Sequence, residues 1–153
     1  MDHAEKAIEY FNGGANCAQS VFAAYSDLTG IDETISLKLA SSFGGGMGKL
    51  REVCGALTGA FAVVGALYGY AEHDQKAKED HYALIQHIAS EFKKEHKTYI
   101  CRELLAGIPN TEGKSPAVRD AKYYAVRPCA RFVLTACEVL DKVISEREKA
   151  DKK

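Results

Sequence analysis

The stretch VCGALTGAFAVVGALYGYA, residues 53–71, carries no charged side chain and decides the fold. Its 19 residues approach the length of a helix that crosses a bilayer, so a membrane span has to be considered. Nine of the 19 are Gly or Ala, however, which leaves little apolar surface to drive the segment into lipid. Small residues at 55, 59, 65 and 69 instead let other backbones approach closely, within one chain or in a homodimer. We therefore predict a buried central helix.

Helical signals continue towards the N-terminus. Residues 4–11 carry apolar side chains at helical spacing and are followed by two glycines, which predicts a first short helix. Asn16 and Gln19 match a capping box, so Cys17 should be the first residue of a second helix that ends near Gly30.

A third helix is expected to begin after Asp32, with Ile35, Leu39 and Phe43 facing inward. The glycine-rich run GGGMG at 44–48 would end it. This run and the lysine after it resemble an anion cradle. A P-loop, however, needs glycine in place of Phe43, Ser or Thr at position 50, and a preceding strand. We expect no nucleotide site there, but a turn that delivers the next cysteine.

The C-terminal half reads as helical too. A long amphipathic helix is expected from about residue 74, with a restart at Thr98 that would put Cys101 in a first turn. Ser115 followed by proline predicts a further short helix, and Pro128 opens the last one. No segment alternates with period two, so the fold class is all-α.

Size and composition define the rest of the architecture. A chain of 153 residues, 46% hydrophobic and 27% charged, has the dimensions of one globular domain. We predict a single domain over residues 1–153, a bundle of about six to eight helices around the Gly/Ala-rich one. With 20 basic and 21 acidic side chains, we expect no nucleic-acid partner. The N-terminal sequence shows no signal-peptide pattern, so we expect cytoplasmic localisation and reduced thiols.

Five cysteines stand at positions 17, 54, 101, 129 and 137, and none forms a CxxC pair. Thioredoxin-like, zinc-ribbon and bacterial ferredoxin spacings are therefore absent. Cys17, Cys101 and Cys129 fall in first turns of expected helices, and Cys54 follows the glycine-rich break. Backbone N–H groups at helix starts stabilise thiolates. Cys137 lies roughly 12 Å beyond Cys129 along the same helix, so we assign it to the core.

Cationic and aromatic side chains accompany these cysteines. Arginines at 51, 102, 127 and 131 lie within three residues of the first four thiols, and two tyrosines at 123 and 124 could wall a site. Because cysteine is also a small, frequently buried hydrophobe, spacing alone leaves simple packing open.

The order of several motifs along the chain resembles the C_GCAxxG_C_C family of redox-active proteins. These motifs are NCAQS at 16–20, GGGMG at 44–48, VCGALTG at 53–59 and single cysteines at 101 and 129. The resemblance covers about residues 5–140. It implies that the cofactor-binding and metal-ligating residues are Cys17, Cys54, Cys101 and Cys129. The family also resembles part of the split-Soret cytochromes, which implies an iron-sulfur cluster, but no CxxCH motif for haem attachment is present. Family members are often encoded near transporter genes, which implies a functional link to a transporter.

Three functions use these residues. The first is an electron carrier or oxidoreductase with an iron-sulfur cluster on the four cysteines, serving a redox partner protein. The second is a metal-free thiol-disulfide redox protein or sensor. The third is a helical interaction or accessory module whose cysteines hold structural zinc or only pack.

Overall fold

The computed structural model describes residues 1–109 and 111–152 and confirms the all-α fold. Within these residues there is no β-strand, and one antiparallel bridge joins Val53 to Ile100. Six helices have eight or more residues: α1 (His3–Asn12), α2 (Cys17–Ala24), α4 (Glu33–Ala40), α6 (Gly55–Tyr68), α7 (Gln75–His96) and α10 (Cys129–Asp151). Shorter segments are α3 (Ser26–Thr29), η1 (Ser41–Phe43), α5 (Gly44–Met47), α8 (Cys101–Leu104) and α9 (Ala121–Val126).

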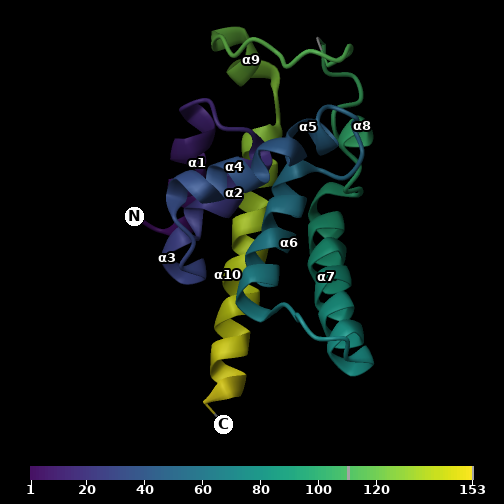
Figure 1. The fold of residues 1–153 in the computed structure, drawn as a ribbon. Coiled ribbons are helices and arrows are strands. Elements are labelled where there is room, and N and C mark those ends of the chain that lie inside the picture. Colours follow the sequence, from purple (N-terminus) through teal and green to yellow (C-terminus); the bar gives the residue numbers. More distant parts are fainter. Residues whose placement is uncertain (110, 153) are drawn as a thin grey trace.

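Helix α6 is the buried central helix that the uncharged segment predicts. It packs against α2, α10 and α7, and Figure 1 shows it between α10 and α7. A Cβ atom added at Gly59 would come within 2.8 Å of the carbonyl oxygen of Ala18 on α2, so this glycine is what allows the two helices to lie so close. No helix in the described part of the chain has the length and apolarity needed to cross a membrane.

The expected start of α2 is confirmed in detail. The Asn16 side chain accepts a hydrogen bond from the Gln19 N–H at 2.9 Å, and the Gln19 side chain accepts one from the Asn16 N–H at 2.9 Å. This reciprocal capping satisfies two N–H groups that a helix start leaves without partners. Cys17 is therefore the first residue of α2.

The expected inner face of α4 is wrong. Asp32 caps the helix as predicted, but Ile35 and Leu39 are 51% and 56% exposed, and Phe43 is exposed as well. Ser36 and Ala40 are buried in their place. The reason is the close approach of α2 and α4, which leaves room only for small side chains between them. The Gln19 side chain confirms this approach by donating a hydrogen bond to the α4 backbone.

The expected helix restart at Thr98 is also wrong, because α8 begins at Cys101. Lys97 ends α7 in a left-handed conformation, and the next residues pair with residues 52–54. The Cys54 N–H donates to the Tyr99 carbonyl at 2.8 Å. This backbone pairing holds the segment extended and moves the restart to Cys101, which still lies in a first turn.

The loop before α9 departs from prediction as well. Ser115 and its proline start no helix; instead Asp120 caps α9, accepting a hydrogen bond from the Tyr123 N–H at 2.9 Å. A carboxylate at the N-cap position therefore does what the Ser-Pro pair was expected to do. Pro128 precedes α10 as predicted.

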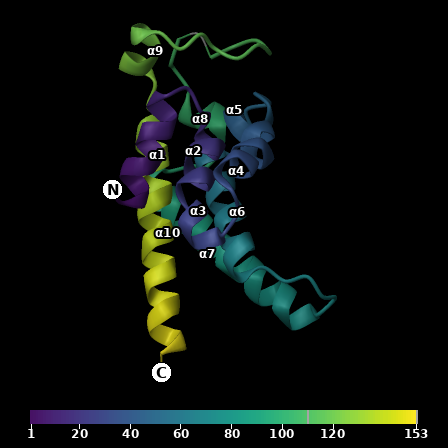
Figure 2. The same ribbon diagram turned by 60° about the vertical axis from the view of Figure 1, so that its left-hand side comes forward.

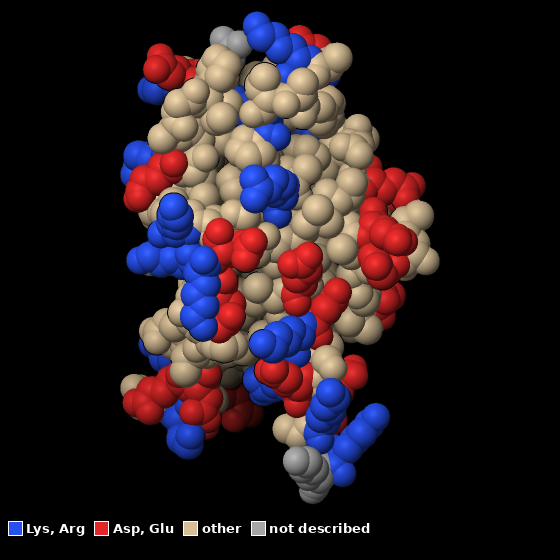
Figure 3. Space-filling model, turned by 180° about the vertical axis from the view of Figure 1, so that it is seen from behind, with Lys and Arg blue, Asp and Glu red and all other residues tan. Residues whose placement is uncertain are grey.

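The two long helices diverge away from the rest of the fold. In Figure 2 the first turns of α7 and the last turns of α10 extend in different directions from the packed helices. Viewed from behind, Lys and Arg lie among Asp and Glu over this lower part of the molecule (Figure 3). On α7, for example, Lys76 and Asp80 form an exposed ion pair at 2.8 Å.

Candidate functional site

Four of the five cysteines line one small cavity of about 60 Å³. They are the four named by the sequence motif, and each stands at a helix start: Cys17 opens α2, Cys101 opens α8, Cys129 opens α10, and Cys54 immediately precedes α6. The starts of α6 and α10 lie near α8 in Figure 1. All four are free thiols, and all but Cys17 are buried. The fold therefore brings together four helix N-termini that are far apart in sequence.

Two glycines allow this convergence. Gly46 has a φ of 69°, and a Cβ atom there would lie 2.7 Å from the Cβ of Cys101 and 2.7 Å from the backbone nitrogen of Glu52. At Gly55 a Cβ atom would lie 3.1 Å from the Phe43 carbonyl oxygen and 3.3 Å from the Cys17 Cβ. The glycine-rich loop thus delivers its segment to the cavity, as the sequence suggested, because side chains at these positions would push the cysteine segments apart.

A short backbone pairing places Cys54 beside Cys101. The Cys54 N–H donates to the Tyr99 carbonyl, and the Cys101 N–H donates to the Glu52 carbonyl at 2.5 Å. Sequence reasoning missed this pairing, since neither segment is long enough to show the alternating pattern of a strand.

Cys17 and Cys129 interact directly through their thiol groups. The Cys17 thiol donates a hydrogen bond to the Cys129 sulfur, and this bond is the largest of the effects that lower the pKa of Cys129 to about 7. Arg127 and Arg119 act in the same direction, while burial opposes them. The same hydrogen bond, together with burial, raises the pKa of Cys17 well above its ordinary value. The hydrogen bond therefore makes Cys129 the more acidic thiol of the pair, with a lowered pKa, and Cys17 the less acidic one, with a raised pKa.

The other two thiols are protonated at neutral pH. Burial raises the pKa of Cys54 to about 12, although the N–H groups of Ala56 and Leu57 donate to its sulfur and partly oppose this shift. Burial also raises the pKa of Cys101, against the opposing effect of Arg51, whose Nη1 lies 3.5 Å from the Cys101 sulfur.

Three guanidinium groups line the cavity: Arg51, Arg119 and Arg127. The first and third were expected from the sequence. Of the other two arginines near cysteines, Arg102 pairs with Glu52 at 2.6 Å and Arg131 is exposed, and neither lines the cavity.

Arg119 is the cationic residue that sequence reasoning missed. It stands ten residues before Cys129 in an irregular segment that carries no periodic signal. Its guanidinium group lies 4.5 Å from the centroid of the Phe11 ring and 5.1 Å from that of Tyr123, and it donates to the Phe11 carbonyl at 2.8 Å. Tyr123 also lines the cavity, whereas Tyr124 contacts Phe11 instead.

Cys137 lies in the core, as predicted. It is fully buried, and its carbonyl accepts a hydrogen bond from the Tyr25 hydroxyl at 3.1 Å. Burial raises the pKa of Cys137 to about 12, and the residue does not line the cavity. Within residues 1–109 and 111–152, no group of three or more His, Cys, Asp or Glu side chains is arranged to hold a metal ion.

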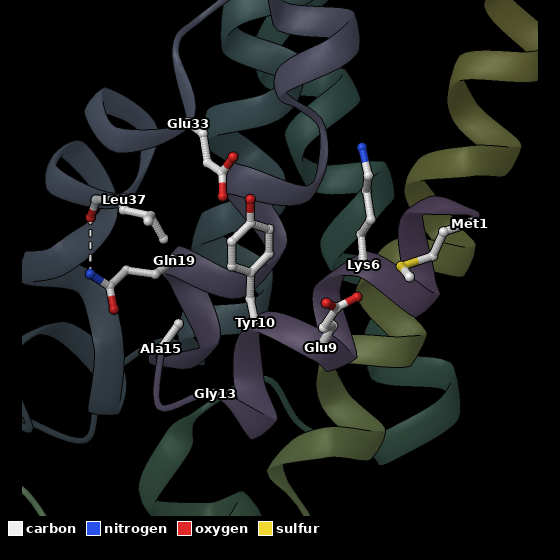
Figure 4. A pocket seen from close by; sticks show the side chains of 9 residues that line it. All are labelled: Met1, Lys6, Glu9, Tyr10, Gly13, Ala15, Gln19, Glu33 and Leu37. Carbon is white, nitrogen blue, oxygen red and sulfur yellow. Dashed lines mark hydrogen bonds between the residues drawn. The ribbon is translucent and has the colours of Figure 1, made fainter.

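A wider groove of about 630 Å³ lies between α1, α2 and α4 and contains no cysteine among its described lining residues. Figure 4 shows the Tyr10 hydroxyl pointing towards the Glu33 carboxylate, with Lys6 and Glu9 nearby. Burial and the hydrogen bond to Glu33 raise the pKa of Tyr10. The groove thus carries both signs of charge and lies apart from the thiols.

A family model matches the part of the chain that contains the four cavity cysteines. The model described as "Putative redox-active protein (C_GCAxxG_C_C)" matches residues 15–143. The chain belongs to the C_GCAxxG_C_C family. The matched region includes all four cavity cysteines and most of α10. No curated protein and no solved structure gives a significant match. The C_GCAxxG_C_C family is described as redox-active, and the matched region contains all the described residues that line the cysteine cavity.

Proposed function

We propose that this member of the C_GCAxxG_C_C family is an electron-transfer protein whose Cys17, Cys54, Cys101 and Cys129 hold an iron-sulfur cluster. The observation that carries the proposal is the meeting of these four thiols, and no other cysteine, in one cavity at four helix starts. Four cysteine thiolates are the usual ligand set of [2Fe-2S] and [4Fe-4S] clusters. The four cysteines match this ligand set in number and kind, and ligation would require their side chains to reorient, because in the described residues they are not arranged to hold a metal ion.

The surrounding residues suit an anionic centre. Cluster ligation needs four thiolates, and three of the four thiols have pKa values raised by burial or by the neighbouring thiol. Arg51, Arg119 and Arg127 supply positive charge against the sulfur atoms. The N–H groups of Ala56 and Leu57 donate to the Cys54 sulfur, and such N–H donors tune the reduction potential of a cluster. A bound cluster would supply one-electron transfer.

The test is anaerobic purification followed by iron, sulfide and zinc analysis and an absorption spectrum. We expect iron with sulfide and a broad band near roughly 400 nm, where thiolate-to-iron charge transfer absorbs. Substituting Ser for any one of the four cysteines should reduce the bound iron, whereas Cys137→Ser, the matched control, should retain it. Iron-free protein that also fails to take up a cluster on anaerobic reconstitution would refute the proposal, as would equal iron loss in all five variants. Zinc in a 1:1 ratio would make the site structural.

The contact between Cys17 and Cys129 favours a second candidate, metal-free thiol-disulfide exchange. The Cys129 thiolate would attack an oxidised partner disulfide, and Cys17 would then displace the partner thiol. Two thiols lose two electrons and two protons, and the partner disulfide is reduced to two thiols. Glutathione disulfide is a suitable probe: metal-free protein should form a Cys17–Cys129 disulfide detectable by peptide mass spectrometry. Glutathione adducts spread evenly over the cysteines would refute this candidate.

A further inference from the structure

A second hollow of about 250 Å³ adjoins the cysteine cavity, and we call it the vestibule. The vestibule and the cavity share six lining residues, including Arg51, Arg119 and Arg127. Any molecule in the vestibule would therefore contact the same guanidinium groups that face the thiols.

The charged residues of the vestibule are all basic. They are Lys49, Arg51, Lys114, Arg119 and Arg127, and no Asp or Glu is among the described residues that line it. Glu112 and Asp120 line an adjoining hollow instead. The Asp120 carboxylate is already engaged in capping α9. Five cations around one small hollow repel one another, and an anion between them would relieve that repulsion.

Proximity to the thiols accounts for only three of the five cations that line the vestibule. Lys49 and Lys114 line the vestibule but not the cysteine cavity. The Lys49 ammonium group donates to the backbone carbonyls of Glu112 and Ser115, which are neutral and leave its charge in place. Burial and the nearby Arg51 and Arg127 lower the pKa of Lys49, as expected for a cation crowded by cations.

A glycine keeps the space between two of these cations open. A Cβ atom added at Gly45 would lie 3.4 Å from the Cβ of Lys49 and 3.9 Å from Nη1 of Arg51, so any larger side chain would grow into the gap between them. Gly45 also has a φ of 68°, which favours glycine. The loop that resembles an anion cradle in the sequence therefore forms one wall of the vestibule.

We propose that the vestibule binds a small oxyanion, either an inorganic anion or the phosphate group of a small organic molecule. Arginine guanidinium groups donate charge-assisted N–H hydrogen bonds to such oxygens, and the lysines add charge; Arg51 already donates from Nε and Nη2 to the neutral Thr111 carbonyl, which leaves its charge in place. At roughly 30 Å³ per water molecule, the hollow has room for a tetrahedral anion and several further atoms. Binding requires only these side chains; the anion's place beside an electron donor rests on the proposed function.

The binding test is isothermal titration calorimetry at constant ionic strength, with sodium sulfate, sodium phosphate and glycerol phosphate as probes and sodium chloride as the control. We expect 1:1 binding with a Kd of about 1 mM or tighter, a free energy near −4 kcal/mol. If glycerol phosphate binds more tightly than the inorganic anions, the natural ligand is the phosphate group of a small organic molecule. If glycerol phosphate and the inorganic anions bind with equal affinity, the natural ligand is an inorganic anion. Lys49→Gln with Lys114→Gln should weaken binding at least tenfold, whereas the exposed Lys142→Gln on α10 should not change it.

Two further measurements keep the inference separable from folding and from the cluster. Sulfate should raise the melting temperature of the wild type more than that of the double lysine variant, whose circular dichroism should match the wild type. The double variant Cys17→Ser with Cys129→Ser should still bind sulfate. The inference about anion binding can therefore hold even if metal analysis refutes the proposed function. No saturable binding to the wild type, equal binding by the double lysine variant, or loss of binding only in the cysteine variant would overturn the inference.

Discussion

Two glycines on α6 offer a matched pair of substitutions with opposite expected signs. Gly59→Ala places a methyl group 2.8 Å from the Ala18 carbonyl oxygen, 3.1 Å from its Cα and 3.2 Å from the Val21 Cβ. Two of these atoms are backbone, so relief requires α2 to move. Gly65→Ala places the same methyl group in a position with no neighbouring atom within 4 Å.

The magnitudes follow from two competing effects. Alanine is favoured over glycine inside a helix by about 1 kcal/mol. At position 65 nothing opposes this, so we expect Gly65→Ala to stabilise the protein by about 0.5–1 kcal/mol. At position 59 the nearest atoms are backbone and cannot move aside cheaply, so overpacking costs about 2–3 kcal/mol, the upper part of the usual range, and forces α2 away from α6. We expect a net destabilisation of about 1–2 kcal/mol for Gly59→Ala.

The assay is urea unfolding of reduced, metal-free protein, followed by circular dichroism at 222 nm, so that cofactor binding does not contribute to the measured stability. Movement of α2 would also displace Cys17 from Cys54, and we expect Gly59→Ala to hold less iron after reconstitution. Unfolding free energies for Gly59→Ala equal to or above those of the wild type would refute the argument that this glycine sets the distance between α2 and α6. A destabilised Gly65→Ala would refute the argument that nothing opposes the helix preference for alanine at position 65.

Three further outcomes are expected. In metal-free protein, Cys129 should be alkylated by iodoacetamide with a midpoint near pH 7, because only its thiolate reacts, and Arg127→Gln should move that midpoint upward. Peptide mass spectrometry at several pH values would measure both midpoints, and an unshifted midpoint in the variant would contradict the role of the guanidinium group. Leu39→Ala on the exposed face of α4 should change the unfolding free energy by less than about 0.5 kcal/mol, whereas Leu57→Ala in the core should cost about 2–5 kcal/mol. Similar losses for the two variants in urea unfolding would show that Leu39 faces inward, as expected from the sequence. Tyr25→Phe removes a hydroxyl whose single hydrogen is shared between the Asp141 carboxylate at 2.7 Å and the Cys137 carbonyl at 3.1 Å, and it should cost about 1–2 kcal/mol. Unchanged thermal stability would count against this shared hydrogen bond.

Sequence predicts the fold best where the deciding interactions are local. The capping box of Asn16 and Gln19 and the cap at Asp32 involve residues three apart, so their consequences are visible in the chain itself. The inner face of α4 is not local. Whether Leu39 or its neighbour Ala40 points inward depends on how close α2 lies, and the apolar pattern alone favours the larger side chain.

The candidate site divides in the same way. The motif identifies the four cysteines, and local signals place Cys17 and Cys129 at helix starts, whereas the helix start at Cys101 depends on backbone pairing with residues 52–54. Arg119 has no such signal, because tertiary contacts with Phe11 and Tyr123 place its guanidinium group at the cavity. Lys114, which belongs to the same irregular loop, reaches the vestibule without any pattern that marks it in the sequence.

The pairing of Val53 with Ile100 sets an order on assembly. It closes a loop of 47 residues that contains all of α6 and α7. Closing this loop has an entropic cost of about 3 kcal/mol, which only the packing of those helices can offset. The fourth cavity thiol arrives with α10, at residue 129. During synthesis, then, three scattered thiols leave the ribosome well before the fourth, and the proposed ligand set is complete only after residue 129 has emerged. Under the proposed function, metal offered earlier would meet separate cysteines rather than a site.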